Sequence, residues 1–287
     1  MARITNAQAG ARGRAEVSRS NIPPIEVKKI VDFIEAATES PVVIIGGRAV
    51  NIWTKQHWRP SHDIDVVLGH KPTAAEFDAM NEYASLFGAR FEINGDPASA
   101  SRMKLKYYSG ETDGAMPDGF VKIDLYYPGY VSSVNDRVPR NDIGGVPIWD
   151  IIGNSKDKNF VGDDGEHMEF RVASIPHMLI MKLSARESEM GRGDKDSKDS
   201  QAIIQISLKD RYELSINIRE LRRDLTTYFP KDADRKFDSI FDNALDYRII
   251  PGMIKQSKYI RMRLEEIDRD TFSALKHVKK KIQTAHQ

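Results

Sequence analysis

Hydrophobic and polar positions follow two different periods along this chain, and the period changes near residue 173. Before that point, short apolar runs rich in β-branched and aromatic residues are bounded by Gly, Pro and Asn, a pattern that predicts β-strands. These runs lie at residues 41–45, 64–68, 88–93, 103–108, 120–127 and 170–174. Apolar residues at helical spacing predict helices in the same half of the chain, at residues 25–37, 48–58 and 73–87.

In the second half of the chain, apolar positions recur with the helical period almost to the end. Breaks at residues 191–196 and near Pro230 and Pro251 divide this region into about five or six helices. The sequence therefore predicts an α+β fold. A mixed β-sheet core with flanking helices occupies residues 22–173, and an all-helical C-terminal domain follows at residues 174–287.

Two segments predict little regular structure. Residues 1–21 hold several arginines and few large apolar side chains, which favours a flexible basic arm over a transit peptide, because Glu16 interrupts the apolar face. Residues 128–168 are rich in Gly, Asp, Asn and Pro, which predicts loops around one or two short strands.

Composition narrows the class of protein. The 287 residues are 40% hydrophobic and 30% charged, enough apolar material for a substantial core. No apolar run reaches the roughly 18 residues of a membrane-spanning helix, and no hydrophobic signal core is present, so we expect a cytoplasmic protein without a membrane partner. Cysteine is absent, which excludes disulfides, thiol nucleophiles and Cys-ligated zinc. The net charge of +1 means that any nucleic-acid site must be a local cluster.

The candidate chemistry begins with two aspartates in a strand-like segment. Asp63 and Asp65 are two residues apart, so in a strand their carboxylates share one face while Ile64 and Val66 point to the other. Two such close anionic groups repel each other unless a cation lies between them. Oxygen ligands at this spacing suit Mg²⁺, which takes one or two carboxylates together with substrate phosphates.

A third carboxylate and a glycine pair complete the pattern. Asp124 alternates with apolar residues in the run at 121–126, so it too occupies the polar face of a strand. If this strand lies beside residues 64–68, three aspartates converge, with Asp113 and Asp118 as the nearest alternatives for the third. Gly46 and Gly47 stand between a strand and a helix, where glycine lets the backbone approach a phosphate and the helix N-terminus attracts it.

These residues resemble the signature of the polymerase-beta-type nucleotidyltransferase superfamily: a Gly-Gly turn, an Asp-x-Asp strand, then a third carboxylate on a later strand. Within it, the run Arg59-Pro-Ser61-His-Asp63-Ile-Asp65 is most similar to the AbiEii-type nucleotidyltransferases, which are toxin components of toxin–antitoxin systems. The resemblance implies a nucleotidyltransferase-like sheet core. It also implies that Asp63, Asp65 and Asp124 are catalytic metal ligands, and that the nucleotide is bound by Gly46, Gly47, Arg59 and Ser61.

A second block extends the resemblance to the helical half. Residues 175–188 resemble the family helix whose lysine contacts nucleotide phosphates, and Lys182 stands at that position. Residues 195–203 resemble the following Lys-Asp-x-x-Asp helix, which implies an acceptor or supporting role for Asp196 and Asp199. Read from the residues alone, Lys182 could equally be a solvent-reaching lysine, Asp196 a helix N-cap and Asp199 a partner of Lys195.

Together these features predict a Mg²⁺- (or Mn²⁺-) dependent enzyme that moves an NMP group from an NTP, such as ATP, to an acceptor hydroxyl and releases pyrophosphate. The acceptor would be a transfer RNA or other RNA, with the basic clusters at residues 219–224 and 279–281 as candidate contacts, and an antitoxin protein would be a further partner. Two alternatives stay open: a small-molecule, antibiotic-type nucleotidyltransferase, and a non-catalytic nucleotide-binding component of a toxin–antitoxin pair.

Overall fold

The computed structural model describes residues 22–54, 61, 63–94, 103–110, 119–130, 139–162, 165–188, 193–207 and 211–244. The chain divides into two compact units, Met1–Ser184 and Ala185–Gln287. The division falls inside a helix, so that Lys182 belongs to the first unit and Glu187 to the second.

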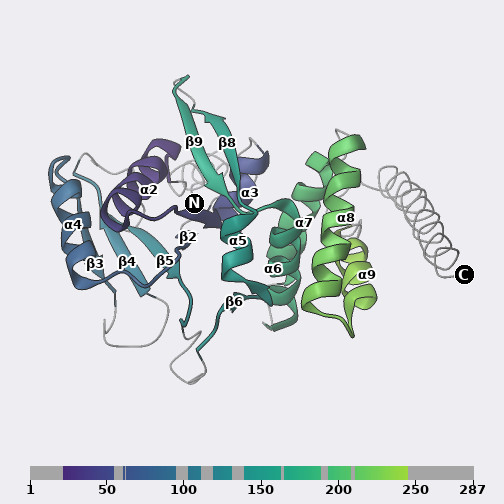
Figure 1. The fold of residues 1–287 in the computed structure, drawn as a ribbon. Helices are drawn as coiled ribbons and strands as arrows, with labels where there is room; N and C mark the ends of the chain where they lie inside the picture. Colours follow the sequence, from purple (N-terminus) through teal and green to yellow (C-terminus); the bar gives the residue numbers. More distant parts are fainter. Residues whose placement is uncertain are drawn as a thin grey trace, which may run out of the picture. The chain divides into compact units, whose positions relative to one another are not determined.

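A mixed seven-stranded sheet forms the centre of the first unit (Figure 1). Its strands are β1 (Val43–Ile45), β2 (Asp63–Val67), β3 (Arg90–Ile93), β4 (Met103–Tyr108), β5 (Val121–Tyr126), β8 (Lys156–Val161) and β9 (His167–Val172), in the spatial order β3–β4–β5–β2–β1–β9–β8. The β2–β5 and β1–β9 pairs are parallel, and the other neighbours are antiparallel. A separate hairpin joins β6 (Asp142–Ile143) to β7 (Val146–Pro147).

The helices of this unit are α2 (Pro24–Thr38), α3 (Gly46–Thr54), α4 (Ala74–Ser85) and α5 (Ile148–Gly153). Helices α2 and α4 lie side by side against the apolar face of the sheet, as Figure 1 shows. Phe33 of α2 meets Phe91 and Tyr107 there, with ring centroids 6.3 and 6.4 Å apart. Because side chains alternate along each strand, the opposite face of β3–β5 carries polar residues.

Helix α4 shows how local sequence sets an element's start. The Thr73 hydroxyl accepts a hydrogen bond from the Glu76 backbone N–H, while the Glu76 carboxylate accepts one from the Thr73 backbone, a complete capping box. Burial raises the pKa of Glu76, but hydrogen bonds from Thr73 and His70 outweigh it and hold that pKa below its usual value. The charged form of Glu76 is therefore the form that caps the helix.

The elements that the structure describes in the second unit are all helices. The described helices are α6 (Ile175–Ser188), which crosses the division, α7 (Gly193–Ser207), α8 (Arg211–Tyr228) and α9 (Ala233–Ala244). The end of α6 is tied to α9 by Glu187, whose carboxylate lies 3.3 Å from Arg235 Nη1 and 2.8 Å from Lys236 Nζ. Apolar side chains of α9, including Phe237 and Phe241, are buried.

This architecture confirms the predicted α+β class with a mixed sheet and flanking helices. The region at residues 128–168 is more regular than predicted, because it contains α5 and the six-residue strand β8. Strand β8 alternates weakly and is mostly exposed, so its sequence carries little of the period-two signal that predicts a strand. None of the described helices has the length and apolar character needed to cross a membrane.

Candidate functional site

Two of the predicted aspartates are direct neighbours in the sheet. Strands β2 and β5 run parallel, and their register pairs Asp65 with Asp124. Asp63 precedes Asp65 by two residues and therefore shares its face, while Ile64 is fully buried on the other side. The adjacency of the strand that carries Asp124 to residues 64–68 is thus confirmed.

Gly46 brings a helix terminus to the same aspartate. It follows β1 directly, begins α3 and has φ of +65°, a backbone conformation that glycine adopts without strain. A Cβ atom at this position would lie 2.2 Å from Asp65 Oδ2, so only glycine leaves room for the carboxylate. The predicted turn is shorter than expected, because Gly46 and Gly47 already belong to the helix. Asp65 therefore lies beside the positive end of α3.

The segment before β2 is held by a buried arginine that the sequence pattern does not single out. Ser61 is 2% exposed, and its hydroxyl lies 3.1 Å from the backbone oxygen of Asp63 and 3.4 Å from Asp63 Oδ1. Arg48 of α3, 3% exposed, donates from Nη2 to the Ser61 carbonyl at 3.2 Å. The one charged residue in this short, mostly buried helix is the signal that could have identified Arg48.

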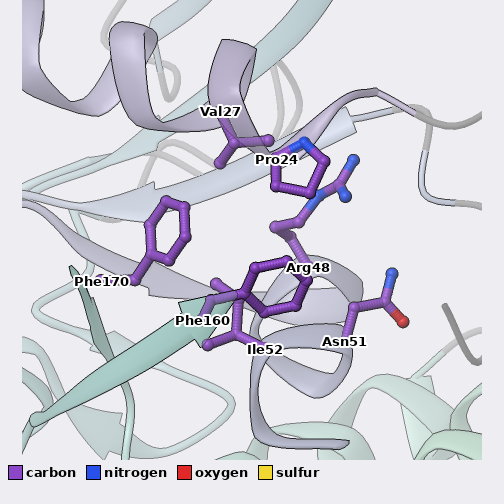
Figure 2. Close-up of a pocket in the computed structure, with 7 residues that line it drawn as sticks. All are labelled: Pro24, Val27, Arg48, Asn51, Ile52, Phe160 and Phe170. Atoms are coloured by element: carbon purple, nitrogen blue, oxygen red, sulfur yellow. The ribbon is translucent and has the colours of Figure 1, made fainter. Parts of the chain in front are cut away.

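A small cavity of about 10 Å³ adjoins this arginine, which is the space of about one water molecule. Figure 2 shows the side chains around it: Pro24, Val27, Arg48, Asn51, Ile52, Phe160 and Phe170. Most of these side chains are apolar and line the space beside Arg48. The cavity is too small for a nucleotide.

The donor set suits a hard divalent cation, although the side chains are not gathered around one point. Carboxylate oxygens are the ligands that Mg²⁺ prefers, and Asp65 and Asp124 occupy paired positions. Within the described ranges, no group of three or more His, Asp or Glu side chains lies close enough together to hold a metal ion. Three carboxylates on one face of the sheet repel one another, and a bound cation would offset that repulsion.

For the remaining predicted site residues, the structure gives the helix and the burial of each side chain. Lys182 lies in α6 with a partly buried side chain. Asp196 and Asp199 are 6% and 0% exposed in α7, which begins at Gly193, so Asp196 is inside the helix and is not its N-cap. Arg59 lies outside the described residues, as do Asp113 and Asp118.

Comparisons with protein families and curated proteins find similarity to a different kind of protein over part of the chain. The family model for the D subunit of ATP synthase matches residues 242–280, mostly outside the described residues. The chain is 26% identical over 144 residues to the D subunit of the A-type ATP synthase of Pyrococcus furiosus, and 27% identical over 144 residues to its counterpart in Pyrococcus horikoshii. Each match covers 50% of this chain and 64% of the relative, less than two thirds of its length.

Among solved structures, the chain is similar to nucleotidyltransferase-like proteins. MenT4, a nucleotidyltransferase toxin from Mycobacterium tuberculosis, has a TM-score of 0.44 at 12% identity, over 92% of this chain and 99% of that one. An antigenic nucleotidyltransferase-like protein from Paracoccidioides brasiliensis has a TM-score of 0.41 at 14% identity, over 76% and 94%. The antibiotic-resistance factor ANT(2'')-Ia has a TM-score of 0.34 at 12% identity, over 69% and 92%.

Proposed function

We propose that this protein is a divalent-metal-dependent nucleotidyltransferase, which transfers an NMP group from an NTP to an acceptor hydroxyl and releases pyrophosphate. One observation carries the proposal: Asp65 pairs with Asp124 of β5 on one side and with Ile45 of β1 on the other, which brings Asp65 against Gly46 at the N-terminus of α3. Carboxylates for a cation and backbone N–H groups for a phosphate thus adjoin each other, as a metal-bound triphosphate requires.

Each residue has a defined part in this proposal. Asp63, Asp65 and Asp124 would hold Mg²⁺ or Mn²⁺, which when bound supplies charge neutralisation for the phosphates. The backbone of Gly46 and Gly47 would bind the β- and γ-phosphates, and Lys182 would neutralise them. In-line transfer depends on positioning and electrostatic stabilisation more than on covalent participation of the protein.

The first test replaces each aspartate with the uncharged isostere, as Asp63→Asn, Asp65→Asn and Asp124→Asn. We expect each change to lower transfer of labelled NMP by roughly a hundredfold or more, because interactions that stabilise the transition state are lost. Mn²⁺ binding, followed by electron paramagnetic resonance without any NTP, should weaken in parallel. Asp78→Asn on the exposed side of α4 is the matched control and should change neither quantity.

Assays of nucleotide binding, pyrophosphate release and acceptor identity separate the other two functions that the sequence leaves open. A non-catalytic nucleotide-binding component would bind Mn²⁺ and NTP without releasing pyrophosphate in any assay. An antibiotic-type enzyme would transfer NMP to a cationic aminoglycoside. Full Mg²⁺-dependent activity in Asp65→Asn would contradict the site assignment itself.

A further inference from the structure

Helix α6 is buried on nearly every side in the stretch that holds Lys182. The successive residues Met178, Leu179 and Ile180 point about 100° apart around the helix, and they are 1%, 3% and 0% exposed. A helix that is apolar all round has no single face to bury, so its non-directional apolar contacts do not choose one rotation. The position of Lys182 therefore depends on whichever directional contact fixes α6.

The turn of the β6–β7 hairpin makes such a contact with α6 (Figure 1). The Ser184 hydroxyl donates a hydrogen bond to the Gly144 carbonyl oxygen at 2.6 Å. A Cβ atom at Gly144 would lie 2.9 Å from Ser184 Cβ and 3.2 Å from Met181 Cα, so the turn rests on the backbone of the helix. A larger residue at position 144 would have to move the turn, the helix or both.

The turn has little freedom of its own. Gly144 and Gly145 have φ of +61° and +86°, and both central residues of a two-residue type I′ hairpin turn require such values. Asp142 closes the turn, because its Oδ1 accepts a hydrogen bond from the Gly145 N–H at 2.8 Å. A displacement of Gly144 is thus passed on to α6 and is not absorbed by the turn.

The hairpin is also tied to the strands that carry the aspartates. Tyr130 is 4% exposed, and its hydroxyl donates to the Asp142 carbonyl at 2.9 Å. Its ring packs at 5.3 Å on Tyr126, which shares the face of Asp124 in β5. After the hairpin, α5 packs against β2, the other strand with predicted metal ligands. The hairpin therefore links both aspartate strands to α6.

We propose that Gly144 is a positioning residue for nucleotide binding: through its contact with Ser184 it sets where α6, and with it Lys182, lies relative to the aspartates. This inference rests on the proposed nucleotidyl transfer, in which Lys182 binds the triphosphate. By helical spacing, Lys182 points away from the face of Met181 and Ser184, so Gly144 acts by placing the helix. A displacement of about 1 Å is enough to impair a site that depends on positioning.

The test is a double-mutant cycle on nucleotide binding, which needs no catalysis. The probes are the α,β-methylene analogues of ATP, CTP, GTP and UTP with Mg²⁺, whose nucleotidyl group cannot be transferred, and calorimetry measures their affinity. Gly144→Ala is compared alone and together with Lys182→Met, which removes the charge but keeps an unbranched side chain. Gly165→Ala in the β8–β9 turn is the matched control, because Gly165 also has positive φ, but nothing lies within 4 Å of its Cβ position.

We expect Lys182→Met to weaken binding roughly tenfold to a hundredfold, as loss of a hydrogen bond to a charged group does. Gly144→Ala should weaken binding about threefold or more when Lys182 is present, and by less than about 1.5-fold when Lys182 is already replaced. Gly165→Ala should bind like the wild type. Mn²⁺ binding without nucleotide should be equal in all these variants, because the aspartates lie in the sheet.

Ser184→Ala provides the second arm, in case Gly144→Ala does not fold. It adds no atom and removes only the hydroxyl that binds the Gly144 carbonyl. We expect it to weaken binding about twofold, and again only while Lys182 is present. Circular dichroism checks the folding of every variant.

Equal losses with and without Lys182 would overturn the proposal, because Gly144 would then act through another group. Wild-type affinity in the folded Gly144→Ala and Ser184→Ala variants, or in Lys182→Met, would overturn it as well. If Asp65→Asn abolishes transfer while Lys182→Met binds normally, the transfer activity stands and the role of Gly144 is wrong. If the cycle shows the expected coupling but the wild type transfers no NMP, the role of Gly144 stands and the activity is wrong.

Discussion

Because Gly46 has no Cβ atom, the carboxylate of Asp65 can lie close to the start of α3. Gly46 and Gly119 both have positive φ, of +65° and +71°, so alanine at either position carries a similar backbone penalty of about 1–2 kcal/mol. Their surroundings differ, because nothing lies within 4 Å of a Cβ at Gly119, whereas at Gly46 it meets Asp65 Oδ2 at 2.2 Å.

The pair therefore gives a controlled prediction. Gly46→Ala should destabilise the protein by about 1 kcal/mol more than Gly119→Ala, because Asp65 must move as well. It should also weaken Mn²⁺ binding, which Gly119→Ala should not. Urea unfolding and metal titration measure the two effects. If both alanine variants bind Mn²⁺ like the wild type, the carboxylate of Asp65 is not a ligand.

Ser61 supports a second residue-level prediction, since its hydroxyl contacts Asp63 and is buried. The sequence resemblance implies a nucleotide contact, and the two roles differ kinetically. Ser61→Ala should lower kcat about tenfold through a misplaced Asp63, leave the NTP KM within about twofold, and cost about 1 kcal/mol of stability. A raised KM at unchanged kcat would instead favour direct nucleotide contact.

Single elements differ in how much of them the sequence predicts. The strands β2, β4 and β5 and the helices α2 and α4 follow clear hydrophobic periods, and they lie where those periods place them. The hydrophobic pattern does not predict α5 or β8. Helix α5 is very short, and strand β8 exposes most of its residues. The hydrophobic pattern reflects burial, so it gives little signal for an element that buries few side chains.

The contact between α6 and α9 makes a prediction about pH. Burial raises the pKa of Glu187, but its hydrogen bond and attraction to Lys236, then to Arg235, outweigh burial and lower that pKa below its ordinary value of 4.5. A carboxyl whose folded pKa is lowered contributes stability at pH above its unfolded pKa. That contribution is lost as the pH falls through the folded pKa.

Glu187→Gln should therefore cost about 0.5–1 kcal/mol at pH 7, as a partly exposed ion pair does, and progressively less below about pH 4.5. Urea unfolding followed by circular dichroism across pH 3–7 measures this difference. Asp238→Asn on the exposed side of α9 is the control and should show no such convergence with the wild type. A Glu187→Gln penalty that stays constant down to pH 3 would contradict a role for the charge.

At the scale of the whole molecule, the sequence predicts which residues share a face of the sheet better than how they are arranged. The polar face of Asp63, Asp65 and Asp124 follows from period-two alternation alone. Register, the contact of Gly46 with Asp65 and the buried support from Arg48 depend on packing between distant segments, which periodicity does not encode. The metal roles of the aspartates and the phosphate role of Lys182 stay predictions.

The division into two compact units supplies the last prediction. Nearly all predicted ligand contacts, Lys182 included, lie in Met1–Ser184, whereas Asp196 and Asp199 lie in the second unit. All three tryptophans, at 53, 58 and 149, also belong to the first unit, so their fluorescence reports its unfolding alone. Circular dichroism at 222 nm reports both units, because both contain helices.

With Mg²⁺ and NTP at about 100 times Kd, binding stabilises the folded state by about 2.7 kcal/mol, which should raise the fluorescence midpoint by roughly 5–10 °C. The circular dichroism melt should then show that one transition moves while the second stays in place. Asp65→Asn should abolish the shift, because the metal-bound triphosphate loses its ligand. If the second transition rises equally, residues of the second unit such as Asp199 bind the ligand too, and the site does not belong to the first unit alone.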